Sequence, residues 1–137
     1  MNILFIGPTR IGDTILASSI INFLIDQNFV SGIGNIYASE ILFLCKILPS
    51  KVVSSLSLND CQKISHFSKI VLRKAIEKGG SSIRDFTNTS GDQGSFQKNF
   101  NVYQRENKKC LKYSCKGTIH KKFISNRSSF FCNLCQK

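Results

Sequence analysis

The sequence predicts a mainly α-helical domain followed by a small β-hairpin that four cysteines hold together. Three observations lead to this expectation. Apolar residues recur every three or four positions between residues 20 and 78, as on one face of a helix. Glycine-containing breaks divide that stretch into separate helices. Beyond residue 110, two pairs of cysteines flank a segment of alternating apolar and polar residues, which is the pattern of a hairpin.

Two helices are expected before residue 50. The apolar run at residues 20–29 has a helical pattern, and the following turn contains Gly32 and Gly34. A second helix fits residues 36–47, because Pro49 disfavours a helical residue directly before it. In this turn Asn35 stands where a helix cap would lie, directly before the second helix.

A third, longer helix is expected at residues 59–78. Ser57 or Asn59 can cap its start, and two consecutive glycines at 79 and 80 stop it. Its apolar face has steps of three or four residues and consists of Ile64, Phe67, Val71 and Ala75.

Less regular segments flank these helices. Residues 3–6 are expected to form a short buried strand, followed by a helix that Asp13 or Thr14 caps. Residues 81–94 are polar and contain glycine, which predicts a short helical turn and then a loop. Residues 100–105 are predicted to form a short strand.

The spacing of four cysteines predicts a structural zinc site. Two cysteines separated by four residues are followed, after sixteen residues, by two separated by two, and these ligands are Cys110, Cys115, Cys132 and Cys135. Four thiolates fill the tetrahedral shell of one Zn(II) and leave no open position for water. The alternative is that they are free thiols or a redox pair. Between them, strands at 118–124 and 128–131 would form a hairpin with Arg127 near its tip.

The remaining cysteines and histidines have no partners at metal-ligand spacing. Cys45 and Cys61 are therefore expected to be small buried apolar residues. His66 is expected on the surface or in the core of the third helix, and His120 in the basic hairpin.

The positive charge lies mainly in the last third of the chain. Residues 96–137 carry ten Lys or Arg and one acid, Glu106, whereas residues 1–95 carry nine against seven. This distribution suits a polyanion such as nucleic acid, and it equally suits a solvated basic face. No targeting signal or membrane-spanning run is evident, so a reducing, cytoplasmic and nucleoid-associated location is expected, with no membrane partner.

Two features could contact a phosphate backbone. The first is the turn at Gly34 and Asn35, because backbone N–H groups and the dipole of a helix N-terminus favour anions. The same turn also serves as a plain connection between two helices. The second is the hairpin, where Arg127 and nearby lysines can lie against a groove.

These residues resemble the C-terminal half of formamidopyrimidine-DNA glycosylases, from residue 23 to residue 137. The matching stretches are 24–27 (LIDQ), 30–40 (VSGIGNIYASE), Pro49, 83–86 (IRDF), 94–97 (GSFQ), 102–103 (VY) and 127–132 (RSSFFC). The resemblance implies a helix–two-turn–helix domain at 22–95 and a zinc finger at 96–137. It also implies binding of duplex DNA, damaged or abasic, in base excision repair.

The resemblance further implies roles for individual residues. Asn35 and Arg127 would contact DNA phosphates around the lesion, and Tyr103 would lie on the DNA-facing surface. The loop that contains Ser81, Ser82 and Arg84 would lie over the extruded base. The first cysteine pair departs from the family, which usually has two residues between these ligands instead of four.

The start of the chain departs further from that family. The family's nucleophile is the secondary amine of an N-terminal proline, followed by a glutamate, whereas this sequence begins Met1-Asn2. Residues 1–21 are instead similar to the opening of heptosyltransferase-like glycosyltransferases. We therefore expect a fusion near residues 20–24 that lacks the β-rich catalytic domain and leaves apolar surface exposed.

Four functional interpretations follow. The first is a DNA-binding module without catalysis, inactive as an enzyme by itself. The second is a residual glycosylase or lyase on oxidised purines, in which the Met1 amine or a lysine attacks an abasic sugar. The others are a glycosyltransferase fragment and a degenerate product with no selected role. The sequence leaves the lesion specificity and the oligomeric state open.

Overall fold

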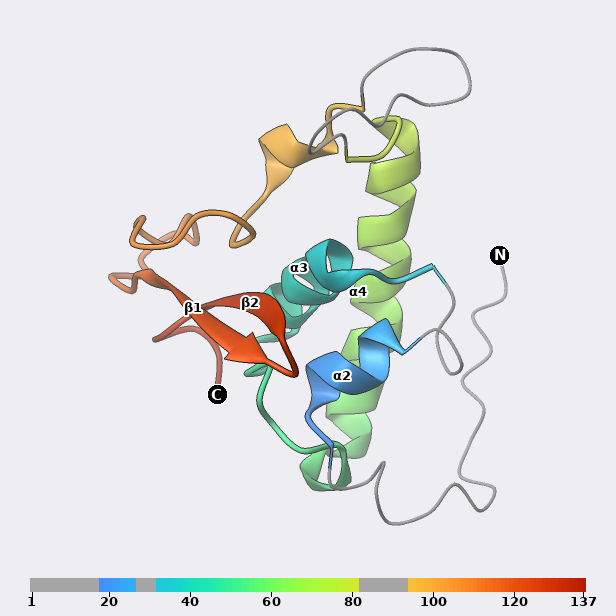
Figure 1. The fold of residues 1–137 in the computed structure, drawn as a ribbon, viewed down its shortest axis with the longest axis vertical. Coiled ribbons are helices and arrows are strands. Elements are labelled where there is room, and N and C mark those ends of the chain that lie inside the picture. Colours follow the sequence, from blue (N-terminus) through green and yellow to red (C-terminus); the bar gives the residue numbers. More distant parts are fainter. Residues whose placement is uncertain (1–17, 27–31, 82–93) are drawn as a thin grey trace.

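The computed structural model describes residues 18–26, 32–81 and 94–137 (Figure 1). In chain order the elements are α2 (Ile20–Ile25), α3 (Asn35–Cys45), the 3₁₀ turn η1 (Val53–Ser55), α4 (Leu58–Glu77), the 3₁₀ turn η2 (Phe96–Asn99), β1 (Ile119–Ile124) and β2 (Arg127–Cys132). This mainly α architecture with a two-stranded antiparallel sheet confirms the predicted fold class. None of the helices in the described ranges could cross a membrane. The expected strand at 3–6 and the helix capped at Asp13 or Thr14 lie outside those ranges.

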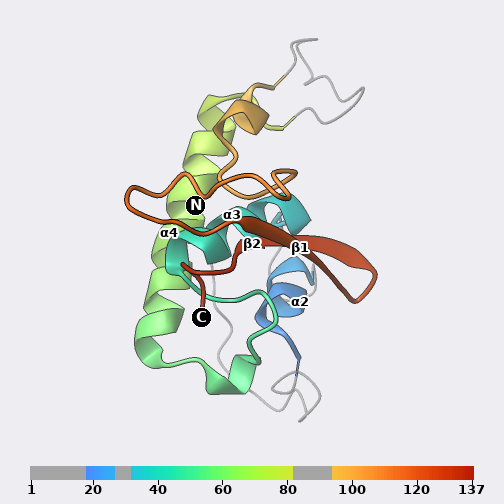
Figure 2. The same ribbon diagram turned by 90° about the vertical axis from the view of Figure 1, so that its left-hand side faces the viewer.

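Helix α3 is the centre of the structure. It contacts α2, α4 and β2, so the two helices and the hairpin surround it (Figures 1 and 2). Its residues Ala38, Ile41 and Leu42 are fully buried because neighbours cover almost its whole circumference. The helix ends at Cys45, two residues before the predicted end, because Lys46 adopts a left-handed conformation with φ of 62°.

Helix α4 begins and ends as the sequence predicts, within one residue. Ser57 is its cap: its hydroxyl accepts a hydrogen bond from the backbone N–H of Asp60, and the Asp60 carboxylate accepts one from the Ser57 N–H. Gly79 and Gly80, with φ of 68° and 83°, end the helix in conformations that favour glycine. The predicted apolar face is confirmed, with Ile64, Val71 and Ala75 buried and Phe67 partly buried.

Helix α2 is shorter than predicted. Its C-cap, Asp26, is already extended, with φ of −75° and ψ of 110°. The chain before α2 pairs with residues that follow α3: the Ile20 N–H donates to the Lys51 carbonyl at 2.7 Å, and the Val53 N–H donates to that of Ser18 at 3.0 Å. These bonds hold α2 beside the start of α4.

The prediction of a strand at residues 100–105 is wrong. It forms bends and turns, because its N–H groups pair with a side chain instead of a neighbouring strand. The backbone N–H groups of Asn101, Val102 and Tyr103 all donate to the carboxylate of Glu40 in α3, at 2.9 to 3.0 Å. A buried carboxylate is thus hydrogen-bonded by the linker that leads to the hairpin.

The hairpin follows the prediction closely. Ile119 pairs with Cys132 and Ile124 with Arg127, joined by a two-residue turn at Ser125 and Asn126. Both turn residues have positive φ, 48° and 60°, as the twist of a two-residue hairpin requires.

The two parts of the core meet at the hairpin. Phe96 and Phe100 are buried in the main cluster with α2, α3 and α4. A second cluster joins Phe43 of α3 to Val102, Cys110, Ile119, Phe130 and Cys132. The partly buried Leu44 and Tyr103 pack against both clusters and link the helices to the hairpin. The domain boundaries at 21/22 and 95/96 stay predictions.

Candidate functional site

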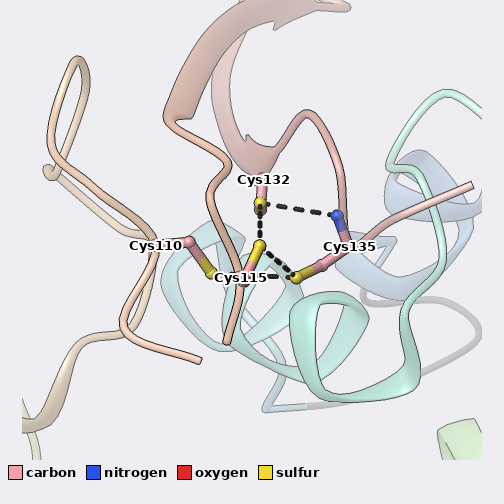
Figure 3. Close-up of side chains that lie close together, drawn as sticks. All are labelled: Cys110, Cys115, Cys132 and Cys135. Atoms are coloured by element: carbon pink, nitrogen blue, oxygen red, sulfur yellow. Dashed lines mark hydrogen bonds between the residues drawn. The ribbon is translucent and has the colours of Figure 1, made fainter. Parts of the chain in front are cut away.

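The four cysteines predicted as metal ligands lie together (Figure 3). Their sulfur atoms are all within 4.8 Å of one another: Cys110 lies 3.8 Å from Cys135, Cys115 lies 3.7 Å from Cys132 and 3.1 Å from Cys135. A tetrahedral metal with bonds of about 2.3 Å separates its sulfur ligands by about 3.8 Å. A disulfide needs about 2.05 Å, so none of the three distances is that of a bonded pair, and those of 3.7 and 3.8 Å fit sulfur atoms around a shared metal. The geometry is compatible with a metal site formed by all four sulfurs.

Backbone N–H groups point at three of these sulfurs. Lys112 N–H donates to Cys110, Gly117 N–H to Cys115, and Cys135 N–H to Cys132, at 3.4 to 3.5 Å. Such bonds stabilise thiolates, the form that binds metals.

The thiols of the cluster differ in pKa. The hydrogen bond with the Cys135 thiol and the bond from the Gly117 N–H lower the pKa of Cys115 to about 7. Burial raises the pKa of Cys110 and that of Cys135. Metal binding must therefore displace protons from part of the cluster.

The sequence analysis missed two residues that shape this cluster. A Cβ at Gly117 would lie 2.6 Å from the Cys132 sulfur, so only glycine fits there. Gln136 is buried; its amide donates to the Ile47 carbonyl and its oxygen accepts from the Cys132 N–H, both at 2.8 Å. Gln136 thus joins the cysteine cluster to the segment after α3. A glycine two positions after a ligand was the available signal for Gly117; Gln136 had none.

The other cysteines and histidines are outside the cluster. Cys45 is buried, as predicted, and burial raises the pKa of its thiol to about 12. Cys61 is exposed in the first turn of α4, so the prediction that it is buried is wrong. It lies one turn before Ile64 and lines an open hollow with Ile64 and the α2 residues Ile20, Phe23 and Leu24. His66 is exposed on α4, and His120 is exposed on β1 with its Nε2 3.2 Å from the Thr118 hydroxyl.

The turn before α3 and the hairpin tip, which the sequence analysis singled out separately, lie next to each other. Gly34 is the N-cap of α3 and Asn35 is its first residue, so the prediction of Asn35 as the cap is wrong. The Asn35 side-chain amide instead donates to the backbone carbonyl of Ser128. Asn35 is thereby held beside Arg127, whose exposed side chain starts β2.

A second contact fixes the hairpin tip. The Asn22 amide of α2 donates to the Ser125 hydroxyl at 2.8 Å. Asn22, Asp26, Ser125 and Arg127 together line a shallow hollow at this place. The hairpin tip that carries Arg127 is therefore held against α2 by this contact and against the start of α3 by the hydrogen bond of Asn35.

Tyr103 lies in a row of aromatic rings that runs from α3 to the hairpin. Its ring is 5.5 Å from that of Phe100 and 4.9 Å from that of Phe130, edge to face in both cases. Phe96 extends the row to Tyr37 in α3. Of the loop residues predicted to lie over an extruded base, Ser82 and Arg84 are outside the described part of the chain, and Ser81 pairs with Ser95 at the loop's base.

Comparisons with known proteins agree with this geometry. Residues 13–87 match the family described as the formamidopyrimidine-DNA glycosylase H2TH domain. The chain is 45% identical over 115 residues to a formamidopyrimidine-DNA glycosylase of Haemophilus influenzae, covering 84% of this chain and 42% of that protein. It is 43% identical over 114 residues to the enzyme of Cereibacter sphaeroides, covering 83% of this chain and 40% of that protein. The chain thus spans about two fifths of the length of these relatives.

Solved structures give the same result. Lactococcus lactis Fpg in a complex with abasic-site DNA superposes with a TM-score of 0.79 at 34% identity, covering 88% of this chain and 44% of that one. The MutM (Fpg) protein of Thermus thermophilus has a TM-score of 0.80 at 32% identity, covering 88% of this chain and 45% of that one.

Proposed function

The chain belongs to the formamidopyrimidine-DNA glycosylase H2TH domain family, and on this premise we propose that it binds duplex DNA, damaged or abasic. The contact surface is the N-terminal end of α3 together with the hairpin tip. The hydrogen bond from Asn35 to the Ser128 carbonyl carries this proposal, because it holds a helix N-terminus beside the exposed guanidinium of Arg127. Both groups favour phosphate oxygens.

The individual roles follow from this arrangement. Gly34 and Asn35 would present backbone and amide N–H groups to one phosphate, and Arg127 would pair with a neighbouring one. Tyr103 would lie at the edge of the same surface, where its ring packs against Phe130. Ser81, Ser82 and Arg84 would belong to the loop over the extruded base.

We further propose that Cys110, Cys115, Cys132 and Cys135 hold one structural Zn(II). The sulfur distances suit a tetrahedral ion, and thiolate ligands favour zinc in a reducing compartment. With four sulfurs bound, the ion has no position for water or substrate. Its contribution is to fold the hairpin that carries Arg127.

We also propose that these residues bind DNA without excising a base. The two prolines, Pro8 and Pro49, stand inside the chain and offer no free amine of the kind that the family uses as nucleophile. Residues 1–21, 22–95 and 96–137 remain our proposed division into a glycosyltransferase-like stretch, a helical DNA-binding domain and a zinc finger. Slow lyase action by a lysine, or a product without a selected role, are the alternatives.

Binding of a duplex that contains an abasic-site analogue tests the proposal. Arg127→Ala should lower affinity about tenfold or more, because a charge-assisted hydrogen bond is worth about 1.5–3 kcal/mol. Arg73→Ala, on the exposed face of α4, is the matched control and should change affinity less than about twofold. Equal effects of the two substitutions would remove Arg127 from the interface. Borohydride trapping on abasic DNA checks the absence of catalysis, since a cross-link comparable to that of an intact glycosylase would contradict it.

A further inference from the structure

A second basic surface lies at the other end of α3. The helix has 11 residues, so its C-terminal end is about 16 Å from Asn35. At that end the cysteine loops and the last residues of the chain surround an open hollow of about 680 Å³. We call it the knuckle hollow, and the residues that matter to the argument are Lys46, Lys112, Tyr113, Lys116, Leu134 and Lys137.

Three separate segments bring these lysines together. Lys46 follows α3 directly, in a left-handed conformation. Lys137 pairs with it through the backbone, because the Lys137 N–H donates to the Lys46 carbonyl at 3.1 Å. Lys112 and Lys116 come from the loop around Cys115, which has four residues between its cysteines instead of two.

The knuckle hollow has an excess of positive charge. Among the residues that the structure describes, no Asp or Glu lines it. With the proposed Zn(II), four thiolates carry a net charge of about −2, which the four lysines exceed. The surplus favours an anionic ligand.

An aromatic ring stands among these lysines. The side chain of Tyr113 is 95% exposed, and Leu134 on the same hollow is 56% exposed. A bare ring interleaved with lysines is typical of surfaces that bind single-stranded nucleic acid, where bases stack on aromatic side chains and lysines follow the backbone. In a duplex each base already stacks on its neighbours, so its face is not available to such a ring.

We propose that the knuckle hollow binds single-stranded nucleic acid, with a base stacked on Tyr113 and phosphates held by Lys46 and Lys112. This site is separate from the duplex surface at Asn35 and Arg127. It offers a DNA repair protein a contact to an unpaired strand next to the duplex that it holds.

Tyrosine fluorescence makes the proposal testable in the full-length, zinc-loaded chain. The sequence has no Trp and three Tyr, and the other two, Tyr37 and Tyr103, are partly buried against other rings. Titration with an eight-nucleotide oligothymidylate should quench the emission of Tyr113. Tyr113→Ala should abolish that quenching and lower affinity about tenfold, whereas Tyr113→Phe should keep the affinity because the ring remains.

The lysines are tested through the salt dependence of binding. Replacing both Lys46 and Lys112 by Ala should flatten the slope of log affinity against log salt by about 1.4, since each lost phosphate contact contributes about 0.7 for single strands. Replacing Lys69 and Lys74, both exposed on α4, by Ala is the matched control and should leave affinity nearly unchanged.

Three outcomes would overturn the proposal. One is unchanged affinity of Tyr113→Ala and of the Lys46 and Lys112 double variant, with normal zinc content and melting temperature. Another is an equal loss of affinity when Lys69 and Lys74 of α4 are replaced. The third is competition by an oligoaspartate of equal charge together with no effect of Tyr113→Ala, which would assign the hollow to an acidic protein partner. Arg127→Ala should retain oligothymidylate binding, so failure at one site is distinguishable from failure at the other.

Discussion

Both oxygens of the Glu40 carboxylate accept hydrogen bonds from Asn101. Glu40 lies in the middle of α3, and Asn101 lies in the linker to the hairpin. The Asn101 backbone N–H lies 2.9 and 3.0 Å from the two oxygens, and its side-chain amide lies 2.9 Å from one of them. Val102 and Tyr103 add two further N–H bonds. Because Glu40 is 1% exposed, these donors replace water as the carboxylate's solvation shell.

Glu40→Gln should therefore destabilise the protein by about 3 kcal/mol. The new amide group would point N–H donors at other N–H donors and leave them unsatisfied in a buried place. Urea denaturation measures the change in the free energy of unfolding. Glu77→Gln, the same substitution at an exposed position of α4, should change it by less than about 0.5 kcal/mol. A Glu40→Gln protein as stable as the wild type would show that the linker finds other partners.

Gln136→Glu should loosen the attachment of the cysteine cluster to the segment after α3. The substitution keeps the shape but replaces the donor to the Ile47 carbonyl by a carboxylate oxygen, and oxygen then faces oxygen. We expect a loss of about 2 kcal/mol in the free energy of unfolding. Gln62→Glu on the exposed surface of α4 is the control. Similar melting temperatures of the two variants would contradict this role.

Removal of the metal should unfold the hairpin before the helices. The main core of α2, α3 and α4 contains none of the four cysteines, whereas the second cluster contains Cys110 and Cys132. Elemental analysis should find one zinc per chain, and a chelator should abolish the protected amides of β1 and β2 while α4 keeps its protection. Cys132→Ser should lose the zinc, and Cys61→Ser, at an exposed position, should retain it. A chain without stoichiometric metal and unaffected by chelation would refute the site.

The capping box of α4 should make stability depend on pH in the acid range. The backbone N–H of Ser57 and then the Lys51 ammonium, 3.3 Å away, hold the pKa of Asp60 below its ordinary value of 3.8. A carboxylate with a lowered folded-state pKa stabilises the fold above the ordinary value and loses that contribution as pH falls through the lowered one. Asp60→Asn should thus be less stable than the wild type near neutral pH, and the difference should shrink at acid pH.

The Ser57 hydroxyl of the same capping box gives an independent test of its contribution to stability. Ser57→Ala should cost about 1 kcal/mol, and this loss should persist at acid pH because a hydroxyl does not titrate. Ser54→Ala, in the exposed turn η1, is the control. Urea denaturation between about pH 2 and pH 6 measures all three variants. A difference between wild type and Asp60→Asn that grows on acidification would have the wrong sign.

Local rules explain which elements the sequence predicted well. The capping serine of α4, its double-glycine stop and its apolar face depend on residues close in the chain, and the structure confirms each of them. The hairpin and the cysteine cluster were equally predictable from the sequence, because the spacing of the cysteines on two short loops constrains where their sulfur atoms meet.

The predictions are wrong where a residue far away in the sequence determines the local structure. Residues 100–105 have the composition of a strand, but the buried Glu40 takes up the backbone N–H groups that a neighbouring strand would need. Asn35 looks like a helix cap, yet its amide bonds to Ser128, 93 residues away. Cys61 was expected to be buried because cysteine usually is, but its position on α4 faces solvent.

The sequence by itself thus determined the helices, the hairpin, which four cysteines come together and the location of positive charge along the chain. Only the tertiary structure decided that Asn35 lies beside Arg127, that Glu40 organises the linker, and that Lys46 and Lys137 join the knuckle lysines. The physical reason is one of range: helix capping and ligand spacing act over a few residues, whereas these pairs form only when α3 is enclosed by the rest of the core.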